Sequence, residues 1–168
     1  TIVSPMHVHR PMQLTSLLSD LSAAGHTTST TVLDYTEHEA DAEDAEHLEV
    51  EEGTAVISCT RIRCADGEPI AVLSNLIPAS IAPTLEELEA GGLYDLLRAQ
   101  DIIPTTAKQV IGARNATTRE ADLLNERRRA ALLTATRTTY DQSGRVIEYG
   151  QHIYRASRYT FETSLFSS

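Results

Sequence analysis

The clearest pattern of hydrophobic and polar positions covers residues 54–78, where an alternation of period two predicts two long strands joined by a turn. The turn falls at residues 65–67, because an Asp-Gly pair between apolar runs supplies the positive φ that a tight hairpin needs. A two-residue loop places Arg61 opposite Val72, whereas a three-residue loop places Arg61 opposite Ala71. The pattern leaves both registers open.

Two arginines interrupt the apolar face of the first of these strands. Arg61 and Arg63 are two positions apart, so the strand period places both guanidinium groups on the same face as Ile57 and Cys59. Two cations held on a half-apolar face of a sheet require a compensating partner. The sequence therefore predicts an anion site on this face.

The rest of the chain alternates short helical and extended patterns. Apolar spacings of three and four residues, with capping residues, predict helices over 15–24, 37–52, 83–92, 93–100 and 117–125. Period-two alternation predicts further strands over 29–36, 105–114, 132–140 and 146–161. Strands interleaved with short helices and hairpin turns are typical of an α+β fold, here with a mostly antiparallel sheet flanked by short helices.

Charge is distributed unevenly along the chain. Residues 37–52 hold nine of the 24 acidic residues and no Lys or Arg, which indicates a solvated surface helix; their spacing does not match a calcium loop. The basic triplet at 127–129 is interpreted as a surface turn, although such a triplet can also meet nucleic acid. The net charge of −10 argues against DNA binding by this chain alone, because phosphate backbones repel it.

Length and composition indicate one soluble domain, since 168 residues with 41% hydrophobic content can bury a core but are too few for two ordinary domains. No apolar run approaches the roughly 18 residues of a membrane span. The N-terminus lacks a signal pattern, so a cytoplasmic location is expected. Residues 1–12 are predicted to be a linker. The His7 and His9 pair within it has no Cys, Asp or Glu nearby, and the two cysteines match no zinc-site spacing, so neither a metal nor a cofactor is expected.

Thr15 and Ser16 stand at the start of the helix predicted over 15–24. Hydroxyl groups at this position cap free backbone N–H groups. The same position, at the positive end of the helix dipole, can also bind a phosphate or a carboxylate. From the motif alone, capping is the simpler interpretation.

In the last predicted strand, Glu148, Gly150, His152 and Tyr154 share one face by the period of two. An acid, a gap and a phenol on one face suit hydrogen bonding to a polar ligand across the sheet from the two arginines. A row of solvent-facing side chains explains the same pattern equally well. Both interpretations remain open.

Four patterns in order resemble the UTRA domain, the ligand-sensing half of the HutC subfamily of GntR-type transcription regulators. The central hairpin has R-I-R, then A-D-G-E-P-I, then a strand ending in L-I-P. The other three are RPMQLTSLLSDLSAAG near the N-terminus, GGLYDLL in the middle and VIEYGQHIYRASRYTF near the C-terminus. Their order along nearly the whole chain makes the combination more specific than any one pattern.

The resemblance implies that residues 13–168 adopt the chorismate-lyase-like fold and form an effector-binding and dimerisation domain. It also implies a homodimer and a winged helix-turn-helix domain ahead of this one. Binding of a small anionic metabolite would then shift the placement of the DNA-binding domains. Together with the arginine pattern, the resemblance predicts that the ligand is bound by Thr15, Ser16, Arg61, Arg63, Tyr94, Glu148 and Tyr154.

Two positions depart from the branch of the family that senses amino-sugar phosphates. That branch resembles this chain but has a Glu in the strand after the Asp-Gly turn and a Ser or Thr before the Tyr of the middle motif. Here these positions are Leu73 and Gly92. Since a carboxylate and a hydroxyl are lost, the expected ligand is a carboxylate or phosphate with a less polar body than glucosamine 6-phosphate.

Two other classes of function are compatible with the same fold. The resemblance to chorismate lyase suggests an enzyme acting on a small carboxylate, with Arg61, Arg63 and Glu148 at its site. The sequence has no nucleophile-and-base pair, no H-E-x-x-H and no phosphate-loop glycine pattern, which favours a binding domain over an enzyme. A dimerisation module with an empty pocket is the third interpretation.

Overall fold

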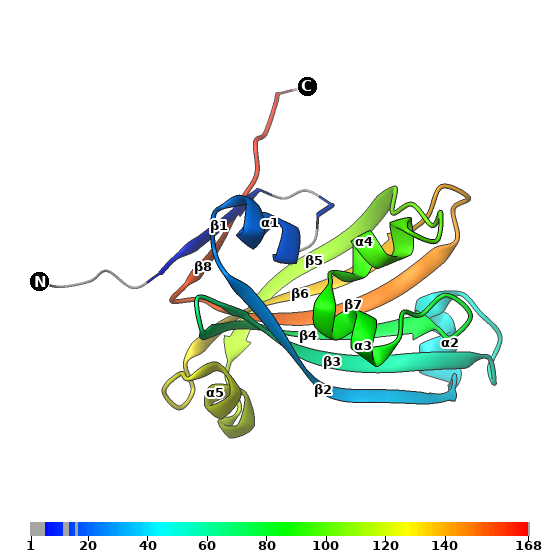
Figure 1. Cartoon of the computed structure of the whole chain (residues 1–168), viewed down its shortest axis with the longest axis horizontal. Helices are drawn as coiled ribbons and strands as arrows, with labels where there is room; N and C mark the ends of the chain where they lie inside the picture. Colours follow the sequence, from blue (N-terminus) through cyan, green and yellow to red (C-terminus); the bar gives the residue numbers. More distant parts are fainter. Residues whose placement is uncertain (1–5, 12–13, 16, 168) are drawn as a thin grey trace, which may run out of the picture.

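The computed structural model describes residues 6–11, 14–15 and 17–167 and shows an α+β fold built on one antiparallel sheet of six strands (Figure 1). The strand order is β2-β3-β4-β7-β6-β5, and a separate pair, β1 and β8, is parallel. The predicted fold class is confirmed. The strands are β1 Val8–Pro11, β2 Thr28–Glu39, β3 Ala55–Ala65, β4 Glu68–Pro78, β5 Thr106–Asn115, β6 Ala131–Tyr140, β7 Val146–Arg155 and β8 Tyr159–Glu162.

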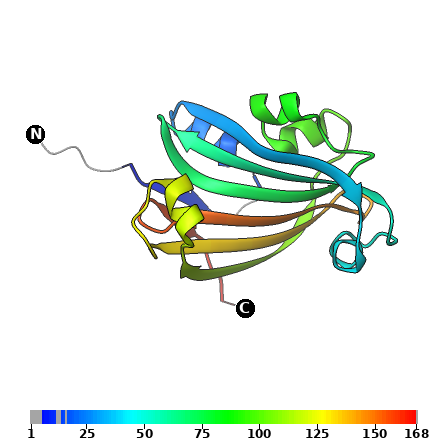
Figure 2. The ribbon, with the colours of Figure 1, turned by 90° about the horizontal axis from the view of Figure 1, so that it is seen from below.

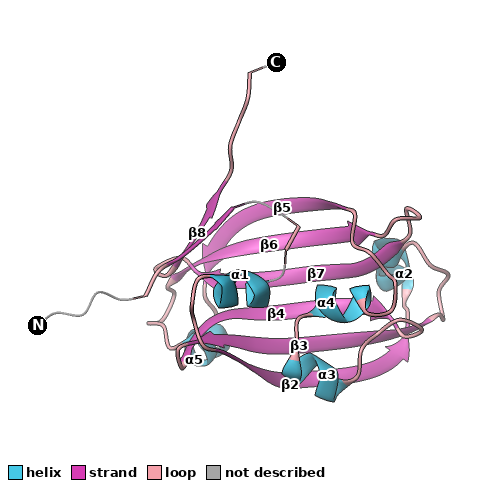
Figure 3. Cartoon of the chain, turned by 45° about the horizontal axis from the view of Figure 1, so that its top comes forward, coloured by secondary structure: helices cyan, strands magenta, loops and turns pink. Residues whose placement is uncertain are grey.

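Within the described residues, five short helices cover the two faces of the sheet (Figure 3). They are α1 Leu17–Ala23, α2 Ala42–Leu48, α3 Leu85–Ala90, α4 Leu93–Arg98 and α5 Thr118–Leu124. Helices α1, α3 and α4 lie on one face, here called the inner face, while α2 and α5 lie on the other, the outer face (Figures 2 and 3). None of the helices in the described ranges is long and apolar enough to cross a membrane.

The alternation along each strand explains this division into two layers. On the inner face, Ile57 and Cys59 pack with Leu88 and Leu97 from α3 and α4. On the outer face, Leu76 packs with residues of α2, and Val72 packs with residues of α5. A strand period of two separates these two sets, as the sequence predicted.

The central hairpin has a two-residue turn, one of the two loop lengths that the sequence left open, but neither predicted register. Asp66 and Gly67 have φ values of 52° and 82°, the left-handed conformation that such a turn requires. A register shift between Arg63 and Cys64 leaves one extra residue in β4, so Arg61 pairs with Leu73. The shift follows the proline at position 69, which has no N–H to donate to the ladder and is tolerated at a bulge.

Three predicted boundaries were wrong because long-range pairing overrode the local pattern. Part of the predicted linker forms β1, which pairs with β8 and buries Val8 and Arg10. The strand β2 continues through residue 39 because it keeps pairing with β3, so the helix predicted over 37–52 is reduced to α2. The strand predicted over 146–161 is broken by a turn at residues 156–158, after which β8 leaves the main sheet.

The capping residues were predicted more reliably than the boundaries of the strands. Thr117 accepts a hydrogen bond from the backbone N–H of Glu120, whose side chain accepts one from Thr117 in return, so the predicted capping box is confirmed. The arginines at 127–129 lie exposed in a turn, as predicted. Cys59 and Cys64 are free thiols.

Candidate functional site

The inner face holds a small cavity of about 40 Å³ between the sheet and helices α1 and α4. Six of the seven predicted ligand-binding residues line it, although they come from four different elements or loops. The seventh, Ser16, lies outside the described residues. The lining consists of Arg10, Thr15, Leu17, Arg61, Arg63, Leu73, Asn75, Leu93, Tyr94, Arg137, Glu148, His152 and Tyr154.

Arg61 and Arg63 form the cationic side of the cavity. Their exposed fractions are 3% and 2%, and each has one hydrogen bond: Arg61 donates to Asn75 Oδ1 at 2.9 Å, and Arg63 donates to Thr30 Oγ1. Arg61 Nε and Nη1 and Arg63 Nε have no acceptor within the described part of the chain. Burial lowers the pKa of Arg61, and burial together with the charge of Arg61 lowers the pKa of Arg63 to about 10. Arginine side chains stay protonated in proteins, and neither guanidinium group has an ion-pair partner among the described residues.

His152 and Tyr154 extend this side of the cavity along β7. His152 Nδ1 lies 3.2 Å from the hydroxyl of Tyr154, and His152 Nε2 has no partner among the described residues. Burial, together with the charges of Arg137 and Arg61, lowers the pKa of His152 well below its ordinary value. The imidazole is therefore neutral at pH 7 and presents one unpaired nitrogen.

Glu148 forms the opposite side, and its carboxylate is already satisfied by the protein. Glu148 Oε1 accepts hydrogen bonds from the hydroxyls of Tyr94 and Thr139, each at 2.8 Å. Glu148 Oε2 accepts one from Asn75 Nδ2 at 2.8 Å. Because Asn75 also accepts from Arg61, a continuous hydrogen-bonded chain links Glu148 to the cationic side. This carboxylate has little capacity left for a ligand.

Gly150 leaves room between the two sides. A Cβ at this position would lie 2.8 Å from His152 Nε2 and 3.1 Å from Glu148 Oε2. The packing of Glu148 and His152 therefore requires a glycine at position 150. Any larger residue would displace His152 or the carboxylate.

The third wall comes from the N-terminal part of the chain. Thr15 Oγ1 donates to Asp20 Oδ2 at 2.8 Å, and Arg10 Nε donates to the same oxygen at 2.6 Å. Arg10 also donates to the backbone oxygen of Thr15 and to the hydroxyl of Tyr159. The hydroxyl of Thr15 thus donates its proton to Asp20, so towards a ligand its oxygen can only accept a hydrogen bond.

A family model described as "UTRA domain" matches residues 23–160. The chain belongs to the UTRA domain family. The suspected resemblance is therefore confirmed over most of the chain. Arg10 and Thr15 lie before the matched range, so the family model does not cover these two residues of the cavity lining.

Curated relatives of this UTRA domain are transcriptional repressors. The chain is 34% identical over 164 residues to the HTH-type transcriptional repressor NagR of Bacillus subtilis, covering 96% of this chain and 68% of that protein. It is 27% identical over 163 residues to the HTH-type transcriptional repressor PhnF of Mycolicibacterium smegmatis, covering 96% and 67%.

Solved structures resemble the UTRA domain over nearly its full length. The effector domain of PhnF from Mycobacterium smegmatis has a TM-score of 0.88 at 26% identity, covering 95% of this chain and 100% of that chain. A candidate transcriptional regulator from Streptomyces coelicolor has a TM-score of 0.76 at 44% identity, covering 85% and 96%. The chain is therefore similar in fold and in sequence to effector domains of transcription regulators.

The structure adds three polar cavity residues that the sequence analysis missed. Arg10 was assigned to a linker, and only its position on β1 brings it to the cavity. Arg137 donates to the hydroxyl of Tyr94 at 3.1 Å; a period-two face shared with Ala135 and Thr139 was a signal for it in the sequence. The period of two along β4 likewise places Asn75 on the same face as Leu73, which was a signal for Asn75. All three place polar groups in the cavity of this UTRA domain.

Proposed function

We propose that this UTRA domain binds a small anionic metabolite between Arg61, Arg63 and His152, and so controls DNA binding by a winged helix-turn-helix domain N-terminal to it. The chain is the effector-binding domain of a GntR-type transcription regulator of the HutC subfamily. Its relatives NagR and PhnF are named as repressors, which supports a role in repression.

The main observation in favour of an anionic ligand is the set of unpaired donors on two buried guanidinium groups. Arg61 Nε and Nη1 and Arg63 Nε face a cavity without an acceptor among the described residues. An unpaired buried polar group costs about 1–3 kcal/mol, and a charged one more. An anion in the cavity would remove this cost, because charge-assisted hydrogen bonds are about twice as strong as neutral ones.

The remainder of the cavity favours a ligand with few polar groups on its body. Leu17, Leu73 and Leu93 contribute apolar surface, and the carboxylate of Glu148 is occupied by three donors from the protein. Sugar hydroxyls placed against these leucines would lose their hydrogen bonds with water and gain none. We therefore keep the prediction of a carboxylate or phosphate ligand with a less polar body.

The first experiment is native mass spectrometry of the purified chain, which looks for a retained metabolite. The second compares the thermal stabilisation of the parent with that of Arg61→Ala and Arg63→Ala across a panel of small carboxylates and phosphates. Each variant should weaken binding by roughly 1.5–3 kcal/mol, since each loses charge-assisted bonds. Arg98→Ala, on the exposed side of α4, is the matched control. Unchanged ligand responses in both cavity variants would place the site elsewhere.

The partners proposed for the whole regulator follow from the family. DNA would be bound only through the N-terminal domain, because this chain has a net charge of −10. A homodimer and a cytoplasmic location are proposed on the same grounds. The absence of any ligand-dependent change in melting temperature would instead support a dimerisation module with an empty pocket.

The enzyme alternative has no support in the cavity. Its one carboxylate, Glu148, is held by three hydrogen bonds, and no serine or cysteine is among the residues that line the described cavity. The relatives NagR and PhnF are named as transcriptional repressors. We propose that the domain binds its ligand without converting it, and a turnover assay on chorismate is the direct check.

A further inference from the structure

The floor of the cavity on the inner face is apolar and lies between two sets of polar side chains. Leu73 on β4 pairs with Arg61 on β3 and with His152 on β7, so these two polar residues flank it. Two residues earlier on β4, Ala71 pairs with Arg63. Neighbouring strands are about 4.8 Å apart, so the backbones of Arg61 and His152 are about 10 Å apart across this floor. An anion on the floor can therefore contact both side chains at once.

The contacts of His152 decide which of its two ring nitrogen atoms carries the proton. Nδ1 lies 3.2 Å from the hydroxyl of Tyr154, and the guanidinium group of Arg10 interacts with the same hydroxyl. Because a guanidinium group can only donate, it occupies a lone pair of the hydroxyl oxygen and leaves the hydroxyl proton for Nδ1. The neutral imidazole then carries its own proton on Nε2.

The unpaired Nε2 of His152 lies beside the space in front of Gly150. A Cβ at position 150 would lie 2.8 Å from Nε2 and 3.1 Å from Glu148 Oε2, so these two atoms flank the same space. Because Nε2 carries the proton, it is a donor that a ligand oxygen can accept. It joins Arg61 Nε and Nη1 and Arg63 Nε as the buried donors that lack an acceptor within the described ranges.

Positive charge dominates the surroundings of His152. Four cations act on its ring from three strands: Arg10 on β1, Arg61 and Arg63 on β3, and Arg137 on β6. Two carboxylates belong to the walls of the same cavity, Glu148 on β7 and Asp20 on α1, and each accepts hydrogen bonds from the protein. Burial and the four cations lower the pKa of His152 well below its ordinary value. The free imidazole is therefore neutral because it is buried among more cations than carboxylates.

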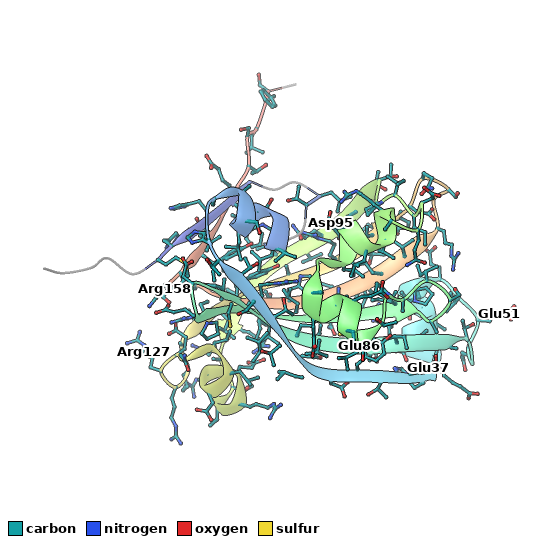
Figure 4. The ribbon with its side chains drawn as sticks, viewed as in Figure 1. Glu37, Glu51, Glu86, Asp95, Arg127 and Arg158 are labelled. Carbon is teal, nitrogen blue, oxygen red and sulfur yellow. The ribbon has the colours of Figure 1, made fainter. Side chains whose placement is uncertain are left out.

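The hydroxyl groups around His152 do not titrate near neutral pH. Burial raises the pKa values of Tyr94, Tyr154 and Tyr159, so these phenols stay protonated. Charged side chains such as Glu51 and Arg127 lie at opposite ends of the molecule (Figure 4) and are screened by solvent. Among the groups that face the cavity, only an imidazole has an ordinary pKa, about 6.5, that is close to physiological pH.

We propose that His152 takes up a proton from solvent when an anion binds in the cavity, so that an imidazolium holds the ligand together with the two guanidinium groups of Arg61 and Arg63. The proposal rests on the proposed function and adds to it a proton that binds with the effector. A ligand with two negative charges cancels the excess of two positive charges around His152. This removes the electrostatic reason for which the imidazole is neutral in the free domain.

The hydrogen bonds around His152 can accommodate the added proton. It binds at Nδ1, which then donates to the hydroxyl oxygen of Tyr154 instead of accepting from it. The hydroxyl proton of Tyr154 is released from Nδ1 and can turn to the ligand, since Tyr154 lines the cavity. Protonation of one residue thus gives the anion one more charge and one more donor.

The sign of the effect on binding follows from linkage. A group whose pKa rises when the ligand binds strengthens binding as the pH falls, by at most about tenfold in the dissociation constant per pH unit for one proton. Sulfate is the probe, because it keeps both of its charges between pH 5.5 and 7.5. We expect its dissociation constant to be at least about threefold lower at pH 5.5 than at pH 7.5.

The test is isothermal titration of the 168-residue chain with sulfate at pH 5.5, 6.5 and 7.5, at constant ionic strength and in two buffers of different ionisation enthalpy. The buffer dependence of the heat measures the protons taken up, which should increase in the parent as the pH falls. His152→Gln keeps an N–H donor but cannot titrate, so it should show neither proton uptake nor a pH-dependent affinity. His47→Gln is the matched control, because His47 lies on α2 at the outer face, and it should behave as the parent does.

Three results would overturn the proposal, and they can be told apart. Sulfate binding by the parent without proton uptake would overturn it and leave the anion site intact. Proton uptake that persists in His152→Gln would assign the proton to Glu148 or Asp20 instead. No binding of sulfate at any pH would overturn the anion site that the proposed function requires, and the proposal with it.

Discussion

Replacing Arg61 by Met should stabilise the ligand-free domain while removing its response to anions. The exposed fraction of Arg61 is 3%, and two of its nitrogen atoms, Nε and Nη1, have no acceptor within the described part of the chain. Met has a similar length and no charge, so Arg61→Met removes the buried cation and keeps most of the volume filled. The substitution also removes the repulsion between Arg61 and Arg63 that contributes to the lowered pKa of Arg63.

The size of the effect follows from the hydrogen bonds lost and the penalties removed. Removing two unpaired polar atoms should raise the free energy of unfolding by about 2–6 kcal/mol. Losing the charge-assisted hydrogen bond to Asn75 should lower it by about 1.5–3 kcal/mol. A cavity of about 40 Å³ can still hold water that satisfies part of these donors. The lower end of the range therefore applies, and the expected net gain is about 1 kcal/mol, or about 2–4 °C in melting temperature for a domain of this size.

Urea denaturation of the ligand-free chain measures the gain, and thermal shift with inorganic phosphate and small carboxylates measures the lost response. Arg98→Met, on the exposed part of α4, is the control and should change neither quantity. A decrease of 1 kcal/mol or more in the unfolding free energy of Arg61→Met would refute the reasoning. It would show that the guanidinium already has a partner in the free protein.

The stability of the ligand-free domain should fall as the pH is lowered from about 7.5 to 5.5. The pKa of His152 is depressed in the folded state by burial and by the neighbouring arginines, so below about pH 6.5 the unfolded state binds more protons and stability is lost. The loss at pH 5.5 should be on the order of 1 kcal/mol, and His152→Gln should flatten this dependence in urea titrations. Tyr94→Phe should lower the unfolding free energy by about 1–3 kcal/mol because it leaves Glu148 short of a donor, whereas Tyr140→Phe, with a half-buried ring on β6, should change it little. Isothermal titration should show that N-acetylglucosamine 6-phosphate binds this domain roughly tenfold to a hundredfold more weakly than it binds a domain with Glu and Ser or Thr at these two positions. The reasons are the apolar wall at Leu73 and the missing hydroxyl at Gly92, and a low-micromolar dissociation constant would contradict this. The chain should not bind duplex DNA at physiological salt, and salt-sensitive, sequence-specific binding in a mobility-shift assay would disprove that expectation.

Patterns of short range were sufficient to predict the central hairpin and its two arginines. The Asp-Gly pair determines the turn because Asp66 and Gly67 both adopt positive φ, and the strand period then places Arg61 and Arg63 on one face. The capping box at Thr117 likewise depends on residues three positions apart. Such features are decided by the local chain and can be recognised without the fold.

The register and the complete cavity were decided by contacts between distant residues. Pairing of Arg61 with Leu73 depends on the bulge after residue 69, whose effect is not visible in the alternation of either strand. Arg10 reaches the cavity because β1 pairs with β8, about 150 positions away, and its guanidinium bonds to Tyr159 and Asp20.

The sequence by itself thus determined the fold class, the turn of the central hairpin and the shared face of Arg61 and Arg63, because these depend on residue types and on periods of two to four residues. Only the tertiary structure decided that Glu148 is saturated by Asn75, Tyr94 and Thr139, while Arg61 and Arg63 keep free donors. Which buried groups find partners depends on the positions of side chains from separate strands, and no local pattern encodes those positions.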